Sequence, residues 1–194
     1  MPKRFVAQFC RARTVVGFAG CLLLAQPGGG ALADGFRVRD VSSELVDDVY
    51  HVSASVDYEL TGPVLEALQS GVRIVIEVPI EVFQPRDWIW DVSVASLSQR
   101  YRLEYHALTR QYLVTNLNSD VQSTYPTRHA ALGALGRVVD LPILDRRLLK
   151  VGEHYMARLR VRLALEELPS PLRLWAYMSG DWRLASDWYV WRLQ

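Results

Sequence analysis

Three arginines occupy alternate positions near the C-terminal end of the chain, at Arg158, Arg160 and Arg162. Side chains two apart on a strand share a face at a spacing of about 6.6–6.8 Å, so the three guanidinium groups would form a row. Guanidinium groups bind phosphates and carboxylates through paired hydrogen bonds, and the row is a candidate docking strip for an anionic partner. The alternative is a solvated face, on which Glu77 and Glu81 of a neighbouring strand cancel the charge through cross-strand pairs.

Tryptophan follows aspartate three times, at Asp87-Trp88, Asp181-Trp182 and Asp187-Trp188, each near an expected junction of a turn and a strand. Indole rings in such places stack on sugars or anchor a partner. We therefore take Trp182 and Trp188 as candidate binding residues beside the arginines. The competing interpretation is core packing, which is the commoner use of tryptophan.

Other patterns argue against several kinds of chemistry. None of the four histidines has the spacing of metal ligands, so no metal site is predicted; they are His51, His106, His129 and His154. The chain has no Gly-x-Ser-x-Gly motif, phosphate-binding glycine loop or dinucleotide fingerprint, which disfavours a serine hydrolase or a nucleotide enzyme. Adjacent acids such as Glu166-Glu167 would point to opposite faces of a strand and could not flank one bond. No catalytic residue and no cofactor is predicted.

Residues 1–33 have the order of a cleavable secretory signal peptide. Four basic residues and no acid precede an apolar stretch from Thr14 to Ala25, and Ala31-Leu32-Ala33 is a small-x-small cleavage site. We expect export to the periplasm through the general pathway. The apolar stretch is shorter than the about 20 residues that span a bilayer, so no permanent transmembrane anchor is expected. Retention of the stretch as an anchor and a lipid anchor at Cys21 are the alternatives.

Removal of this leader changes the composition. Both cysteines, Cys10 and Cys21, lie within it, so disulfides, zinc–thiolate sites and thiol nucleophiles are excluded from residues 34–194. Those residues carry 18 Lys and Arg against 21 Asp and Glu, a formal net charge of −3. That charge gives no electrostatic case for nucleic acid as a partner. Residues 34–194 are long enough for one domain with its own core.

The elements that would position these residues follow from hydrophobic periodicity. Apolar and polar residues alternate in strands expected over Tyr50–Leu60, Val72–Val82, Trp88–Tyr105, Tyr112–Val114, Tyr155–Leu165, Leu172–Met178 and Trp182–Leu193. Pro79 predicts a sheet edge or a bulge, and a change of parity predicts a bulge or break between Val94 and Leu97.

Two short helices are expected, one from Thr61 to Gly71 and one from about Thr127 to Val138. Proline suits the first turn of the former and glycine its exit, while the latter carries an apolar stripe at helical spacing. Strands joined mainly by tight turns predict a mainly β fold, an antiparallel β-sandwich with the two helices inserted.

Spaced landmarks over nearly the whole of residues 34–194 resemble a proteobacterial exported-protein family catalogued only as a domain of unknown function, DUF4390. The landmarks are Trp88-Ile89-Trp90-Asp91, residues 101–112, Leu168-Pro169-Ser170-Pro171-Leu172 and residues 186–191. The family has no established activity, so the resemblance implies no catalytic residues.

Together these observations predict an exported, non-enzymatic envelope domain that binds another envelope protein or an anionic envelope component. The alternative is a hydrolase or lyase that acts on an envelope polymer through carboxylates brought together only in the fold. A pocket with two or more facing acids would favour the enzyme, and its absence from a closed sandwich would favour the binding domain.

Overall fold

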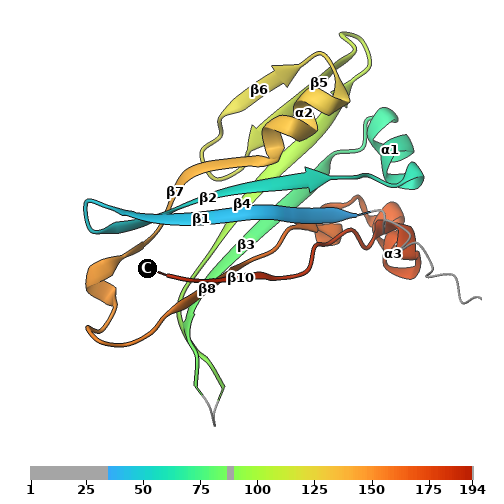
Figure 1. The fold of residues 1–194 in the computed structure, drawn as a ribbon. Coiled ribbons are helices and arrows are strands. Elements are labelled where there is room, and N and C mark those ends of the chain that lie inside the picture. Colours follow the sequence, from blue (N-terminus) through green and yellow to red (C-terminus); the bar gives the residue numbers. More distant parts are fainter. Residues whose placement is uncertain (1–34, 87–89, 194) are drawn as a thin grey trace, which may run out of the picture. The chain divides into compact units, whose positions relative to one another are not determined.

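The computed structural model describes residues 35–86 and 90–193, and the chain from residue 33 onward forms one unit. Two antiparallel sheets make up most of it (Figure 1). The small sheet has the order β1-β2-β7, with β1 at Phe36–Val46, β2 at Val49–Tyr58 and β7 at Arg137–Asp145. The predicted leader lies outside the described residues.

The large sheet has the order β10-β8-β3-β4-β5-β6, and the short strand β9 also pairs with β3. Its strands are β3 (Ile74–Gln84), β4 (Val92–His106), β5 (Gln111–Asn116), β6 (Gln122–Tyr125), β8 (Met156–Leu159), β9 (Arg162–Leu163) and β10 (Tyr189–Arg192). The predicted mainly β class with antiparallel sheets is confirmed.

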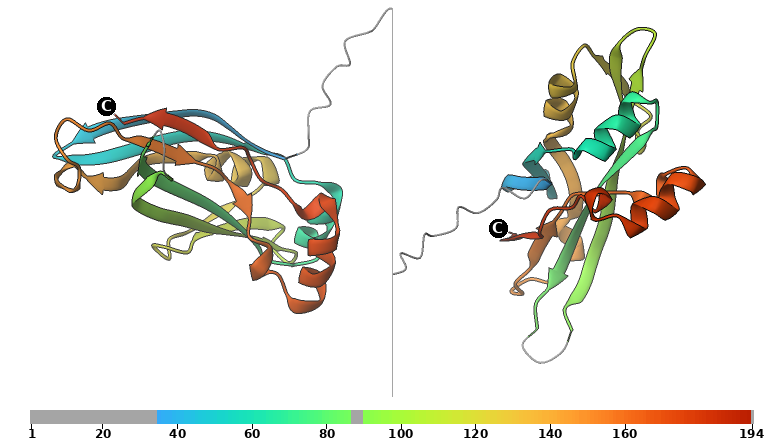
Figure 2. Two further views of the ribbon diagram at one scale, coloured as in Figure 1. Left: turned by 90° about the horizontal axis from the view of Figure 1, so that it is seen from below. Right: turned by 90° about the vertical axis from the view of Figure 1, so that its right-hand side faces the viewer.

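The core lies between the two sheets, which Figure 2 shows as two layers. The inner face of β2 consists of the buried residues Tyr50, Val52, Ala54 and Val56. The inner face of β3 consists of the fully buried residues Ile74, Ile76, Val78, Ile80 and Val82. Both faces follow the alternation of the sequence, because successive side chains on a strand point to opposite sides.

The two predicted helices are present. Helix α1 (Gly62–Gln69) has proline in its first turn, and Gly71 beyond its end has a φ of 85°. Helix α2 (Arg128–Leu135) is capped by Thr127, whose hydroxyl oxygen accepts from the Ala130 N–H at 3.2 Å. Helix α2 contacts β2 and β7 of the small sheet and β5 and β6 of the large one.

A third helix, α3 (Ser170–Met178), replaces the strand predicted over Leu172–Met178. Pro171 stands in its first turn, where a missing N–H costs nothing. Leu172 and Ala176, four residues apart, pack toward the protein, so the apolar pattern has helical spacing rather than that of a strand. The prediction was wrong because Pro169-Ser170-Pro171 was interpreted as a turn between strands.

The predicted strand from Trp182 to Leu193 is also only partly correct. The segment begins with the 3₁₀ turn η3 (Gly180–Trp182), and only β10 is a strand. Trp182 and Leu184 are buried, whereas Val190 is about half exposed. These three residues therefore do not share one face, as a single regular strand would require.

Two strands of the small sheet differ from the predictions. Strand β1 was not predicted, because a register shift between Val38 and Asp40 breaks its alternation. Strand β7 begins at Arg137, a residue that the prediction placed in the second helix. The observed helix α2 ends earlier, at Leu135. Val138 was assigned to the apolar stripe of the predicted helix, but it is buried as a residue of strand β7.

The predicted bulge in β4 is confirmed. The register shifts between Val82 and Phe83 of β3, which pair with Ala95 and Ser93, so that Val94 is the extra residue. It lies at the start of the predicted interval. The extra residue explains why the apolar set of β4 changes from even to odd positions.

Pro79 is neither at an edge nor in a bulge. It lies inside β3 and pairs in regular register with Ser98 of β4. On its other side the sheet is interrupted between β8 and β9, and the Arg160 N–H donates to the Pro79 carbonyl at 3.3 Å. In an antiparallel sheet, the N–H and C=O of one residue point toward the same neighbouring strand. The side on which Pro79 lacks an N–H is therefore the side on which the sheet is interrupted.

Candidate functional site

The three arginines lie on the outer face of the large sheet, the side away from the core. Arg158 pairs with Glu81 across the strands, with its Nε donating at 2.7 Å. Arg162 forms an ion pair with Glu77, the residue opposite it in β3, and its Nη2 also donates to a Glu166 carboxylate oxygen at 2.9 Å. Two of the three guanidinium charges are therefore balanced, as the solvated-face interpretation supposed.

Arg160 differs from its two neighbours. It forms no ion pair with a carboxylate in residues 35–86 and 90–193, and its buried Nε has no hydrogen-bond partner there. Its guanidinium carbon lies 4.5 Å from the centre of the Trp188 ring, and that of Arg158 lies 4.8 Å from the same ring. The indole thus holds two cations through cation–π contacts.

Strand register explains why Trp188 meets Arg160. Strand β10 pairs with β8 so that Tyr189 faces Leu159 and Val190 faces Arg158. Continuing this register by one residue brings Trp188 beside Arg160, on the outer face. We call Arg158, Arg160 and Trp188 the arginine–tryptophan site.

Trp182 does not belong to this site. Its side chain is 1% exposed in the core and makes an edge contact with Trp175 at 6.3 Å between ring centres. A side chain this buried has no surface for a partner, and its position is that of the core-packing interpretation. The Asp87-Trp88 step lies outside the described residues.

The histidines do not gather into a site. His51 Nδ1 lies 2.8 Å from an Asp140 carboxylate oxygen, and His154 contacts Arg192 at 2.9 Å. His106 lies 3.8 Å from Glu104. Within the part of the chain that the structure describes, no three His, Cys, Asp or Glu side chains are placed to hold a metal ion.

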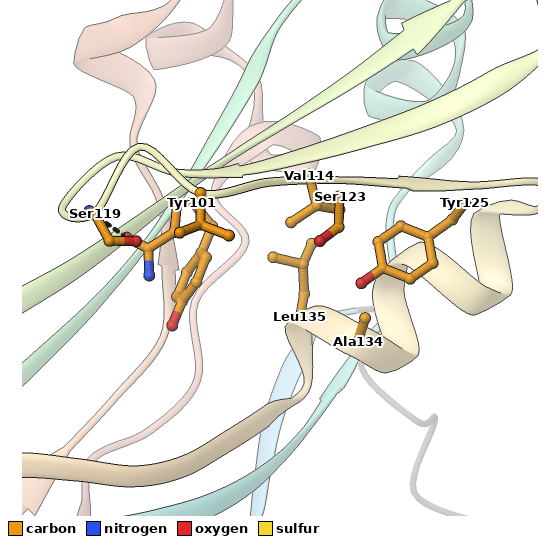
Figure 3. Close-up of a pocket in the computed structure, with 9 residues that line it drawn as sticks. Tyr101, Val114, Ser119, Ser123, Tyr125, Ala134 and Leu135 are labelled. Atoms are coloured by element: carbon orange, nitrogen blue, oxygen red, sulfur yellow. Dashed lines mark hydrogen bonds between the residues drawn. The ribbon is translucent and has the colours of Figure 1, made fainter.

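A cavity of about 310 Å³ lies between β4, β5, β6 and α2 (Figure 3). Its lining is Tyr101, Val114, Asn116, Ser119, Val121, Ser123, Tyr125, Ala134 and Leu135. Burial raises the pKa of the Tyr101 phenol above its ordinary value. No carboxylate and no histidine lines this cavity, so it lacks the facing acids that the enzyme alternative requires.

Helix α3 carries a surface that the sequence reasoning missed. Its exposed large side chains are Leu174, Trp175, Tyr177 and Met178, at 71%, 52%, 49% and 86% exposure. At about 100° per residue these four side chains occupy one continuous arc, opposite Leu172 and Ala176. We call these four residues the α3 face. If helical periodicity had been applied to residues 170–178, it would have separated the α3 face from the packed residues Leu172 and Ala176.

The packing of α3 explains why this face is uncovered. The elements that α3 contacts most are the 3₁₀ turns η2 (Leu165–Glu167) and η3, and the helix projects from the large sheet on the side away from the small one (Figure 2). None of the helices within residues 35–86 and 90–193 has the length and apolar composition of a membrane span.

In a comparison with protein families, residues 33–192 match a model described as Domain of unknown function (DUF4390). No curated protein matches the chain, and no solved structure matches it. The matched segment includes both sheets, the arginine–tryptophan site and the α3 face. The resemblance seen in the landmark residues is thus confirmed over most of the chain, and the protein belongs to the DUF4390 family.

Proposed function

We propose that residues 34–194 form an exported, non-enzymatic domain of the cell envelope that binds an anionic envelope component at the arginine–tryptophan site. The observation that carries the proposal is the environment of Arg160, a cation held against Trp188 and left without a carboxylate partner in the described residues. A stacked guanidinium loses less conformational freedom on binding than a free one, which suits it to a phosphate or carboxylate.

The rest of the site supports the same proposal. Arg158 shares its charge with Glu81, so that its own contribution to anion binding is smaller. Trp188 places both guanidinium groups on one ring and offers an apolar edge beside them. The lining of the described cavity gives no support to the hydrolase or lyase alternative, because it holds no acid.

Export is the second part of the proposal. We infer that residues 1–33 are removed after Ala33 and that the domain works in the periplasm, from the order of basic, apolar and small residues. The binding experiment therefore starts from protein purified from the periplasm. Its intact mass must correspond to a chain that begins at Asp34, and a lipidated Cys21 would contradict this inference.

The test measures binding of labelled polyphosphate and polyglutamate by fluorescence anisotropy, so that phosphate and carboxylate are compared directly. We expect affinity to fall with added salt and to fall about tenfold in Arg160→Gln, the cost of one charge-assisted hydrogen-bonded contact. The double variant with Arg158→Gln should bind still more weakly. The control is Arg147→Gln, on the exposed turn η1 (Arg146–Leu148). Equal binding by Arg160→Gln and the parent would rule out this site.

A further inference from the structure

We propose that the α3 face docks the domain on an anionic phospholipid surface. Its four side chains would enter the boundary between head groups and acyl chains. The inference rests on the proposed function, since it takes lipid phosphates as the anions that Arg160 binds.

Two arginines border the α3 face, one toward each end of the helix. Arg173 donates to the Glu166 carbonyl oxygen at 3.0 Å, and Arg183 donates to the Tyr177 carbonyl oxygen at 3.0 Å. Neither arginine pairs with a carboxylate in the described residues. Both guanidinium charges are therefore not balanced by a carboxylate in the described residues, and both lie next to exposed apolar side chains. Helices that lie in a membrane interface have this combination.

The acids near α3 are mostly balanced. Glu166 and Glu167, on the adjoining turn η2, pair with Arg162 and Arg100. Asp181, beyond the end of α3, accepts from the Ser179 hydroxyl at 3.3 Å. Arg173 and Arg183, which have no carboxylate partner in the described residues, thus outnumber Asp181. The border of the α3 face therefore complements a negatively charged surface.

The area of the face also favours a membrane over a protein partner. The exposed parts of its four side chains amount to an area on the order of 500 Å². A standard protein interface buries about 800 Å² on each partner, whereas an interfacial helix needs only one apolar face. Trp175 and Tyr177 are also the aromatic types that concentrate at the level of lipid head groups.

The arginine row lies on the same side of the large sheet as α3. Arg162 of the row contacts the Glu166 carboxylate, and Arg173 of α3 donates to the carbonyl of that residue. Helix α3 projects from the large sheet on the side away from the small sheet (Figure 2). The arginines face that side as well, because they alternate with the buried Leu159 and Val161. A single flat surface could therefore meet the α3 face and the arginine–tryptophan site together.

The test exploits the absence of cysteine from residues 34–194. Met178→Cys and, as a control, Val139→Cys each carry a nitrobenzoxadiazole label; Val139 is 74% exposed on the small sheet. With vesicles of equal parts phosphatidylglycerol and phosphatidylcholine, emission at position 178 should rise severalfold and shift to shorter wavelength. Position 139 should show no change. Phosphatidylcholine vesicles alone should give a much weaker response.

A pair of matched variants tests the apolar contribution. Leu174→Ser with Met178→Ser should lower vesicle affinity at least tenfold, because two exposed apolar side chains no longer enter the lipid. Leu148→Ser with Val139→Ser removes the same kind of side chain elsewhere on the surface and should bind like the parent. Equal vesicle binding by both double variants would overturn the inference.

The remaining outcomes separate this inference from the proposed function. If the label at position 178 stays silent with vesicles while Arg160→Gln still weakens polyanion binding, α3 does not dock on lipid and the arginine–tryptophan site stands. If emission at position 178 rises with protein concentration and no vesicles are present, a second copy of the chain covers α3, and the lipid inference is wrong.

Discussion

A single proline determines which arginine of the row stays without an acid. Arg158 and Arg162 stand opposite Glu81 and Glu77 in the strand register. Arg160 stands beside Pro79, which has no charge to offer. Exposed ion pairs contribute about 0–1 kcal/mol each, so the row adds little to stability. The main effect of the cross-strand pairs is to neutralise Arg158 and Arg162 and to leave Arg160 without a carboxylate partner in the described residues.

Tyr58 is a partly buried residue whose hydroxyl group no proposed function uses. Its ring packs edge-on against Phe36 at 5.0 Å between ring centres. Its hydroxyl is buried and has no partner among the described residues. Burial, and to a smaller extent the nearby Tyr101, raise the pKa of this phenol above its ordinary value. A buried hydroxyl without a hydrogen bond costs folding free energy.

Tyr58→Phe should therefore stabilise the domain, by about 1 kcal/mol at pH 7. In the parent, the folded state holds the phenol proton at a pH where the unfolded chain, with a pKa near 10, releases it. The parent therefore keeps its full free energy of unfolding below about pH 10. It loses part of that free energy as pH rises from there toward the folded-state pKa of Tyr58. The variant should lose less stability than the parent above pH 10, as measured by urea unfolding at several pH values.

Tyr177→Phe is the control for this experiment, since Tyr177 is about half exposed on α3. It should change neither the free energy of unfolding nor its pH dependence. A Tyr58→Phe variant less stable than the parent at pH 7 would mean that the hydroxyl has a partner in solution.

At the scale of elements, helix α2 is held against the small sheet by one close backbone contact. Gly136 follows the last residue of the helix, and its carbonyl accepts from the Val56 N–H at 2.8 Å. A Cβ placed on Gly136 would lie 2.2 Å from the Val56 carbonyl oxygen. Backbone atoms cannot move aside as a flexible side chain can, so only glycine fits at this crossing.

Gly136→Ala should lower the free energy of unfolding by about 1–3 kcal/mol, the range for overpacking a tight site. Gly133, inside α2, is the matched control, because nothing lies within 4 Å of its Cβ position. Gly133→Ala should raise stability by about 0.5–1 kcal/mol through higher helix propensity. Chemical denaturation of both variants measures the difference. Two equal effects would show that α2 does not sit against β2 as described.

At the scale of the whole molecule, the C-terminal strand joins the two sheets. Strand β10 pairs with β8 in the large sheet, while the Trp191 Nε1 donates to the Ser43 hydroxyl of β1 at 3.2 Å. Leu193 is buried, and its N–H donates to the Tyr155 carbonyl at 3.1 Å. The last residues thus cover the core and connect edges of both sheets.

Deletion of residues 187–194 should unfold the domain or make it insoluble. Burial of one large apolar side chain contributes about 1.5–3 kcal/mol, and a domain of this kind has a total stability of about 5–15 kcal/mol. Thermal unfolding followed by far-UV circular dichroism compares the truncated and full domains. Val190→Ser, at an exposed position of the same strand, should melt within a few degrees of the parent. A stable truncated domain would contradict a structural role for this segment.

Local patterns determined the parts of the fold that alternation or capping specifies directly. The buried set of β2, the apolar face of β3 and the presence of helices α1 and α2 follow from residue order, because strand and helix geometry place side chains at fixed spacing. The bulge near Val94 was also detectable, since it reverses the parity of a regular pattern. The arginines of the row and their pairing partners Glu77 and Glu81 were identified from the same alternation.

Only the tertiary structure decided what depends on neighbours distant in sequence. Residues 170–178 are a helix because they pack on turns rather than in a sheet, and β1 is hidden by its own bulge. The environment of Arg160 depends on Pro79 of β3 and on Trp188, which directly precedes β10. Burial of Trp182 and exposure of the α3 face likewise depend on which surfaces meet. A sequence pattern specifies the faces of an element, but the contacts between elements determine which face is covered.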